Sequence, residues 1–221
     1  MTAELKGTPT TPTLSWAIVG VDTAPVDAVP TLRFHVEITC SGSVVVQSLT
    51  LAVSVRIAAA LRDYTAEERE RLRGVFGTAE QWAHSIGDLV WARPTVHVPR
   101  FTGRTVVEVP VPCGYDVELA SVSYLRALTD GDIPLRFLFS GTLFHDRDGR
   151  LAAARVPWDG EARYRLPASC WHQLRERYFG RHRWLRVDVD TYERLLDYRA
   201  RHAYTSPQEA IESLLKSSGS V

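Results

Sequence analysis

One crowded group of side chains could do chemistry: His145-Asp146-Arg147-Asp148-Gly149, in a chain of 221 residues. An imidazole and two carboxylates this close together could hold a metal ion. A calcium loop of the EF-hand type needs a glutamate at its twelfth position, and counting from Asp146 that position is Pro157, so this kind of site is excluded. Asp-Gly between two apolar stretches is instead typical of a hairpin turn, because glycine adopts a positive φ easily. We therefore predict a turn here and no metal site.

The three cysteines, Cys40, Cys113 and Cys170, are candidate nucleophiles. Cys170 lies two residues before His172, but residues at i and i+2 of a helix point in different directions, so they do not form a local nucleophile–base pair. We expect Cys170 to be structural and partly buried, and the same holds for Cys40 on the apolar side of its strand. The histidines lack HExxH spacing and there is no glycine-rich phosphate loop. The sequence therefore predicts no catalytic, cofactor-binding or metal-binding residues.

Composition limits the class of protein and its compartment. Lys and Arg number 26 and so do Asp and Glu, so the chain has no net charge and nucleic-acid binding is not favoured. Three cysteines without a CxxC pair fit a reducing compartment. The N-terminus lacks an apolar segment typical of a signal peptide, and the most apolar window, 44–61, alternates with a period of two. We expect a cytoplasmic protein that does not associate with membranes.

Strand patterns dominate the first three quarters of the chain. Residues 31–40 alternate strictly, and the apolar members are Leu32, Phe34, Val36, Ile38 and Cys40. A turn at CSGSV and the alternating window 44–61 predict that 31–61 is a β-hairpin. Strands are also expected at 104–113, where Pro110 and Pro112 favour a sheet edge, and at 133–144. Helical connections are expected at 62–90, with a capping box at Thr65, and at 118–128.

The local signals become helical near residue 167. A stripe of Trp171, Leu174 and Tyr178 predicts one helix, a short strand follows at 184–190, and two helices follow the strand. The first is expected to begin at Asp190. The second is expected to begin at Ser206, with a proline next and a glutamate three residues on.

These elements predict a mainly β protein with α-helices. Its architecture is expected to be an immunoglobulin-like antiparallel β-sandwich over residues 13–166 with helical connections. A small α+β appendage, mostly helical, is expected over 167–216. The leader 1–12 and the tail 217–221 are expected to be disordered.

The strand and two helices from Trp184 to Leu215 resemble the ribbon-helix-helix fold of small bacterial DNA-binding repressors and antitoxins. In that family alternate residues of the strand enter the DNA major groove. Here those residues would be Arg186, Asp188 and Asp190, and two carboxylates facing phosphates argue against DNA binding. The resemblance then implies a dimerisation or docking element.

A basic stretch, 175–189, also carries interleaved aromatic residues. Single-stranded nucleic-acid binders combine these residue types. An amphipathic helix with solvated arginines explains the same pattern and is the favoured interpretation.

Three runs carry a wider resemblance: VPCGYDVELASVSYLRALTDGDIPLRFLFSGTLF, VPWDGEARYRLP and RWLRVDVDTYERLLDYRARHAYTSPQEAIESLL. They resemble an uncharacterised family of actinobacterial proteins classed as a domain of unknown function, over nearly the whole chain beyond the leader. That family is associated with genes near NiFe-hydrogenase operons. The resemblance implies an accessory role in hydrogenase biogenesis or assembly. Nothing resembles the cysteine-rich motifs that ligate nickel or iron–sulfur clusters, so a direct role at the metal centre is not expected.

We expect a non-enzymatic protein that acts by contact with a protein partner. Trp91, Phe101 and Trp158 lie near prolines at strand ends, where sandwich domains present contact residues; packing at the rim of the core is the alternative for all three. Two other functions stay open. A DNA-binding regulator using the C-terminal strand and helices predicts a homodimer, and an enzyme of unfamiliar type predicts a concave pocket with several titratable groups.

Overall fold

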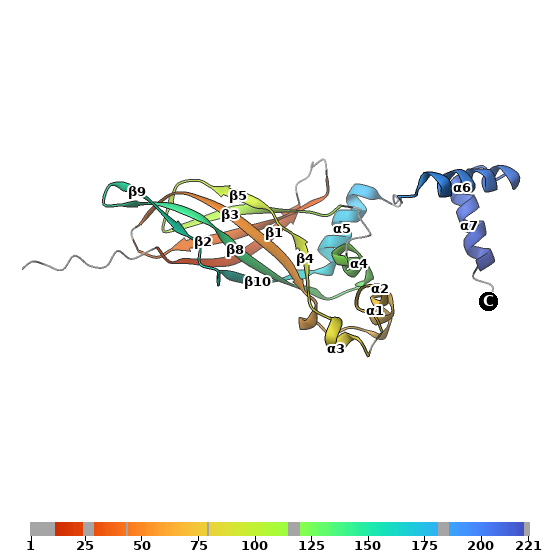
Figure 1. Ribbon diagram of the computed structural model, residues 1–221, viewed down its shortest axis with the longest axis horizontal. Coiled ribbons are helices and arrows are strands. Elements are labelled where there is room, and N and C mark those ends of the chain that lie inside the picture. The colour runs from red at the N-terminus through yellow and green to blue at the C-terminus, as the bar shows by residue number, and fades with distance from the viewer. Residues whose placement is uncertain are drawn as a thin grey trace, which may run out of the picture. The chain divides into compact units, whose positions relative to one another are not determined.

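The computed structural model describes residues 12–23, 29–42, 44–78, 80–114, 120–180 and 186–218. The chain divides into two compact units, Met1–Arg181 and His182–Val221 (Figure 1). Antiparallel β-sheets make up most of the first unit, and several helices accompany them. The prediction of a mainly β protein with helices is confirmed. None of the described helices combines the length and the apolar character needed to cross a membrane.

The smaller sheet has three antiparallel strands in the order β1-β2-β7. Their bounds are β1 Leu14–Thr23, β2 Thr31–Cys40 and β7 Arg104–Pro112. In β2 every second side chain is buried, as the alternating sequence predicts. Among the described strands β7 pairs with β2 alone, so its two prolines lie at a sheet edge as expected.

The larger sheet is built around two long strands, β3 (Val45–Ala58) and β8 (Asp132–Arg147), which pair over most of their length. Along the other side of β8 lie β9 and β10, and along the other side of β3 lie β4, β5 and β6. The bounds of these five strands are β4 Asp88–Ala92, β5 Thr95–Val98, β6 Phe101–Thr102, β9 Arg150–Arg155 and β10 Glu161–Pro167.

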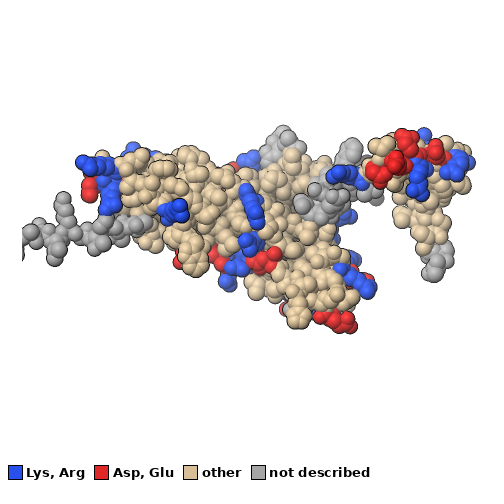
Figure 2. Space-filling view, viewed as in Figure 1, with Lys and Arg blue, Asp and Glu red and all other residues tan. Residues whose placement is uncertain are grey.

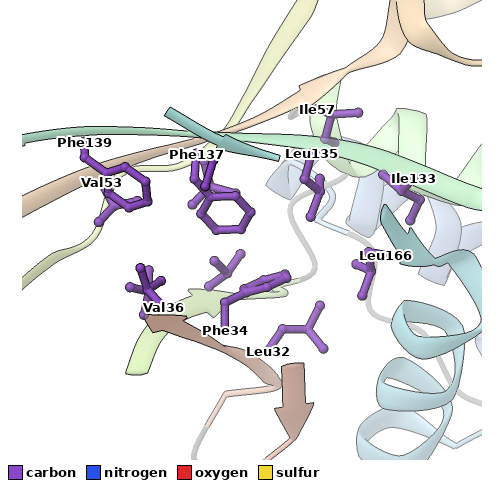
Figure 3. Packing of buried hydrophobic residues seen from close by; sticks show 14 of the residues in the cluster. Leu32, Phe34, Val36, Val53, Ile57, Ile133, Leu135, Phe137, Phe139 and Leu166 are labelled. Atoms are coloured by element: carbon purple, nitrogen blue, oxygen red, sulfur yellow. The ribbon is translucent and has the colours of Figure 1, made fainter. Parts of the chain in front are cut away.

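The hydrophobic core lies between the two sheets. The ring of Phe34 in β2 meets that of Phe137 in β8 edge to face, with centroids 5.1 Å apart. The ring of Trp16 in β1 stacks on Phe139, with centroids 4.3 Å apart. Figure 3 shows the side chains of β2 directed at those of β8 across this core.

The predicted hairpin over 31–61 is wrong. Strand β2 belongs to the smaller sheet and β3 to the larger one, so the two strands do not pair. Each has one fully apolar side, and both sides bury best when they face each other across the core. The CSGSV segment therefore connects two sheets.

Short helices lie at one end of the first unit, after β3 and between β7 and β8. They are the 3₁₀ helix Ala59–Leu61, α1 (Ala66–Arg71), α2 (Arg73–Phe76), α3 (Trp82–Ser85) and α4 (Ala120–Ala127). The predicted capping box is present: the Glu68 amide donates to Thr65 Oγ1 at 3.1 Å, and the Thr65 amide donates to Glu68 Oε2 at 3.1 Å. Glu68 is only 1 % exposed and pairs with Arg62 at 2.9 Å.

Helix α5 (Ala168–Phe179) belongs to the first unit. Its stripe is the predicted one: Trp171 and Leu174 are buried in the core, and Tyr178 packs against it. We expected the helical appendage to begin at residue 167, whereas the compact units divide between residues 181 and 182. The difference arises because α5 buries its apolar side on the β-sandwich.

The second unit is a pair of helices, α6 (Val189–Arg201) and α7 (Pro207–Ser218). The strand predicted for 184–190 does not form in its described part: residues 186–188 are not in a strand, and α6 begins before the expected Asp190. The reason is a cap two residues earlier, where the Asp188 carboxylate accepts from the Thr191 amide at 2.9 Å. The start of α7 after Ser206 is as predicted, with the Glu209 amide donating to Ser206 Oγ at 3.2 Å.

The predicted disordered ends lie mostly outside the described residues. Of the leader 1–12 only residue 12 is described. Of the tail 217–221 only the first two residues are described, and both belong to α7, which therefore extends further than expected.

Candidate partner-binding surface

The group around His145 is a hairpin turn, as predicted. It joins β8 to β9, with Arg147 opposite Arg150, and Asp148 and Gly149 have φ values of 55° and 75°. Asp146 Oδ1 accepts from the Gly149 amide at 3.0 Å, so that carboxylate serves the turn. Within the ranges that the structure describes, no three His, Cys, Asp or Glu side chains are grouped so that they could bind a metal ion.

The cysteines are not arranged as nucleophiles. Burial raises the pKa of the Cys40 thiol and raises the pKa of Cys113 to about 12, which favours the unreactive thiol over the thiolate. Cys170 is partly exposed. Its neighbour His172 places Nε2 2.9 Å from the Leu128 carbonyl oxygen, so this ring nitrogen is already engaged.

Cys170 also lines a hollow whose walls include titratable groups. This hollow has a volume of about 270 Å³, and its lining includes Asp22 and Arg177. Both of these partner with neighbouring side chains: Asp22 pairs with His35 at 2.8 Å, and Arg177 donates to a threonine hydroxyl at 3.1 Å. No hydrogen bond links Cys170 to a base within the described ranges. The described residues of this hollow therefore do not form a nucleophile–base pair with Cys170.

The three predicted contact residues have different environments. Phe101 is 8 % exposed and belongs to the core. Trp91 is partly buried, and its ring meets that of Phe34 edge to face, with centroids 6.4 Å apart. Phe101 and Trp91 therefore pack on the core, which is the alternative that the sequence left open for them. Trp158 is 93 % exposed, so it alone of the three offers its whole side chain to a partner.

Trp158 sits on a turn that is fixed on both sides. Before the turn, the Val156 amide donates to the Gly141 carbonyl at 3.0 Å; after it, the Gly160 carbonyl accepts from the Phe139 amide at 2.9 Å. Both bonds tie the turn to β8. A Cβ on Gly160 would lie 3.1 Å from the indole nitrogen of Trp16, so glycine lets the turn pack closely on the core. An exposed indole on a fixed turn can bind with little loss of backbone entropy.

Strand β9 leads directly into this turn and forms an edge of the larger sheet. Within the described residues it pairs with β8 alone, from Arg150 opposite Arg147 to Arg155 opposite Thr142. A hairpin closed by a two-residue turn directs the backbone groups of residues 150, 152 and 154 toward the other strand. Residues 151, 153 and 155 therefore direct theirs outward, where an added strand could bind them.

The side chains along β9 define what such a strand would meet. Leu151 is 68 % exposed and Ala153 is exposed, and both belong to the outward-facing side of the sheet. Arg150 and Arg155 lie at the two ends, exposed and without an ion pair among the described residues. Figure 2 shows basic side chains gathered at the β9 end of this unit. The edge offers a short apolar centre with a positive charge at each end.

Two other edge strands carry features that block an added strand. Strand β7 contains Pro110 and Pro112, which cannot donate a backbone hydrogen bond. Strand β1 has an irregular register between Ile18 and Gly20. Strand β9 has neither proline nor bulge. In contrast to β1 and β7, β9 is an edge that is open to a partner strand.

Sequence reasoning named Trp158 as a candidate contact residue, and the structure shows that it is exposed; it did not single out β9 as a sheet edge. A signal was present: the segment RLAAAR, two arginines around small apolar residues, directly follows the Asp-Gly turn. The sequence alone does not reveal that this strand has a neighbour on one side only.

Comparisons with known proteins complete the description. Residues 11–221 match a family described as "Family of unknown function (DUF6084)". No curated protein matches the chain. Among solved structures, a β-glucosidase from Kluyveromyces marxianus is similar with 10 % identity and a TM-score of 0.26, over 69 % of this chain and 15 % of that one. β-Glucosidase 3B from Thermotoga neapolitana, in complex with glycerol, is similar with 12 % identity and a TM-score of 0.26, over 71 % and 17 %. Likenesses this distant assign no activity.

Proposed function

The chain belongs to DUF6084, a family of unknown function, and we propose that it is a non-enzymatic binding protein. Its β9 edge and Trp158 together take up an extended segment of a partner protein. The observation that carries the proposal is the 93 % exposure of Trp158 on a turn tied to β8 from both sides. Tryptophan is over-represented among the residues that dominate binding energy at protein interfaces.

The binding mode is strand addition. A partner strand hydrogen-bonds to the outward backbone groups of residues 151, 153 and 155, and these bonds provide affinity without regard to sequence. Specificity comes from the side chains. Arg150 and Arg155 favour acidic residues near both ends of the partner segment, and small or apolar residues suit its centre, beside Leu151. A strand that continues past Arg155 reaches Trp158.

We propose the partner and the compartment from features of the sequence. The resemblance to an actinobacterial family encoded near NiFe-hydrogenase operons supports an accessory role in hydrogenase biogenesis or assembly. Three free cysteines support a reducing, cytoplasmic location. We also propose that the sandwich is of the immunoglobulin-like type, which is supported by its two antiparallel sheets with a shared core.

The test is quantitative co-purification of hydrogenase subunits with the full chain, tagged and expressed in its native host. The wild type should retain them. Trp158→Ala removes the anchor, and Ala153→Pro removes an outward backbone donor while leaving the bonds to β8 in place. Both variants should lose most of the recovered subunits.

The matched control is Val106→Ala, which trims a side chain that is 48 % exposed on β7. Its recovery of hydrogenase subunits should equal that of the wild type. Equal recovery from all four proteins, or none from the wild type, contradicts the proposal.

A further inference from the structure

Three arginines form a row across the outward side of the larger sheet. Arg56 of β3 lies directly opposite Arg136 of β8, and Arg136 lies directly opposite Arg163 of β10. All three side chains are at least partly exposed, whereas the residues on either side of the arginines in β3 and β8 are buried. Side chains in directly opposite positions lie about 4.5–5.5 Å apart, and like charges there destabilise a sheet. The row is therefore unfavourable for the fold unless other charges compensate it.

Two carboxylates compensate part of the row. Glu161 Oε2 accepts from Arg136 Nη2 and Glu161 Oε1 accepts from Arg163 Nε, both at 2.8 Å. From β4, Asp88 Oδ2 accepts from Arg136 Nη1 at 2.9 Å. Figure 2 shows a band of basic side chains over the middle of the first unit, with acidic side chains beside it. The two carboxylates hold the guanidinium of Arg136 in place before any ligand binds.

The compensation is incomplete. Within the described part of the chain, Arg56 donates one side-chain hydrogen bond, from Nε to Ser54 Oγ at 3.4 Å, and it has no carboxylate partner. The side chain of Arg165, two residues after Arg163 in β10, is exposed and makes neither an ion pair nor a hydrogen bond with any described residue. Asp132, at the start of β8, is exposed and pairs with none of these arginines. The four guanidinium groups and the two carboxylates that pair with them therefore leave two positive charges.

A hollow beside the row brings three of these arginines together. Its volume is about 210 Å³, and Arg136, Arg163 and Arg165 all line it. Leu61, which is 55 % exposed, and Pro134 give the hollow an apolar wall. Pockets for drug-sized ligands typically measure about 300–1,000 Å³, so this hollow suits a smaller ligand.

The hollow offers hydrogen-bond donors that the ion pairs do not use. A guanidinium group has about five N–H donors in a fixed, planar arrangement. Among the described residues, Arg163 donates to Glu161 through Nε alone, and the side chain of Arg165 donates to none. Paired N–H groups of this kind match the geometry of a phosphate group, whose oxygens accept several hydrogen bonds at once.

We propose that this hollow binds the dianionic phosphate group of a small organic phosphate. The phosphate oxygens accept from Arg163 and Arg165, and the organic part lies against Leu61. A phosphate monoester carries nearly two negative charges at neutral pH, which balances the two positive charges left by the ion pairs. A carboxylate balances only one of them. Binding here is independent of the proposed function of β9 and Trp158.

The test is isothermal titration calorimetry of the full chain with phenyl phosphate, inorganic phosphate and benzoate. Phenyl phosphate should bind with a Kd of about 1 mM or less. Inorganic phosphate should bind roughly threefold more weakly or worse, because it lacks the ring that contacts Leu61. Benzoate keeps the ring but has one charge, and it should also bind more weakly than phenyl phosphate.

Arg165→Ala removes a guanidinium that lines the hollow and pairs with no described residue. It should weaken binding of phenyl phosphate roughly tenfold and leave thermal unfolding of the protein unchanged. The matched control is Arg100→Ala, which removes an exposed arginine next to β6, at the opposite end of β3 from Arg56. This position is about 30 Å along the strand, so the control should bind like the wild type.

A wild type that binds none of the three probes at about 10 mM overturns the proposal. So does an Arg165→Ala variant that binds phenyl phosphate like Arg100→Ala, because the hollow is then not the site. Equal affinity for benzoate and phenyl phosphate overturns the assignment to a phosphate group. Equal affinity for inorganic phosphate and phenyl phosphate overturns the organic part and assigns the hollow to free phosphate.

Discussion

The two units of this protein are stabilised in different ways. The first unit holds the sandwich core, in which Phe34, Phe137 and Leu49 are all fully buried. The second has one buried side chain among its described residues, and five of its large apolar side chains are exposed. Folding in the first unit is therefore driven by its own burial, whereas the helices of the second depend on local signals and on what covers them.

The free-energy contributions of apolar burial and of helix caps distinguish the two units in the same way. Burying one large apolar side chain contributes about 1.5–3 kcal/mol, and the sandwich buries many of them. A helix N-cap such as Asp188, which accepts from the Thr191 amide, contributes about 1 kcal/mol. Caps can fix where α6 and α7 begin, but they cannot make a stable domain from two helices.

The largest effect should follow a cavity in the sandwich. Phe137→Ala removes a fully buried ring that meets Phe34 edge to face at 5.1 Å. The free energy of unfolding of the first unit should fall by about 3–5 kcal/mol. Denaturant titration followed by circular dichroism measures it. A loss below about 1 kcal/mol would contradict the view that this core drives folding.

The next effect should come from the buried ion pair at the helical end of the sandwich. Glu68 is 1 % exposed, and it accepts from Arg62 at 2.9 Å and from the Thr129 amide at 3.2 Å. Glu68→Ala leaves the Arg62 guanidinium, 12 % exposed, without this carboxylate. The cost should be about 3 kcal/mol in the same titration. Glu67→Ala, which alters a neighbouring exposed carboxylate, is the control and should change stability little.

A smaller effect should appear as a pH dependence of the first unit. Hydrogen bonds from Arg136 and Arg163 lower the pKa of Glu161 from 4.5 to about 2. Because the pKa is lower in the folded state, the interaction stabilises fully above about pH 4.5 and is lost as the pH falls toward 2. The carboxylate is 25 % exposed, so solvent reduces the contribution to about 1–2 kcal/mol.

Arg136→Met removes the largest cause of the lowered Glu161 pKa. Its free energy of unfolding should lie below the wild type at pH 7, and the gap should narrow as the pH approaches 2. Acid denaturation series of both proteins measure the gap. A constant difference at all pH values would show that Arg136 acts by packing alone.

The smallest effect on the first unit should come from α6. Leu196→Ala removes an apolar side chain from α6 and should change the free energy of unfolding of the sandwich by less than about 0.5 kcal/mol. It should lower the helix content of the second unit instead. If Leu196→Ala destabilised the sandwich as strongly as a core substitution, the two units would not be independent.

Prediction from sequence succeeded where the pattern of one segment decides the structure. The alternation of 31–40, the Asp148-Gly149 turn, the capping box at Thr65 and the start of α7 are all local, and all are present. The predicted start of α6 was wrong because Asp188 and Asp190 are both suitable N-cap residues, and the structure uses Asp188. The alternating pattern of the preceding residues also suggested a strand there.

The predictions that failed concern pairing and packing between segments that are distant in the sequence. The apolar sides of β2 and β3 show that both strands face a core, but not that they lie in different sheets. In the same way, Trp91, Phe101 and Trp158 share their position near strand ends, and only the tertiary structure separates the exposed one from the two that pack on the core. The edge position of β9 is also a tertiary property.

Hydrogen exchange of the full chain tests the contrast between the units most directly. Amides of β3 and β8 should exchange slowly, because their protection comes from the core of the first unit. Amides of α6 and α7 should exchange much faster, because this helix pair buries one side chain among its described residues. Protection of α6 and α7 equal to that of β3 and β8 would contradict the claim that the two units are stabilised in different ways.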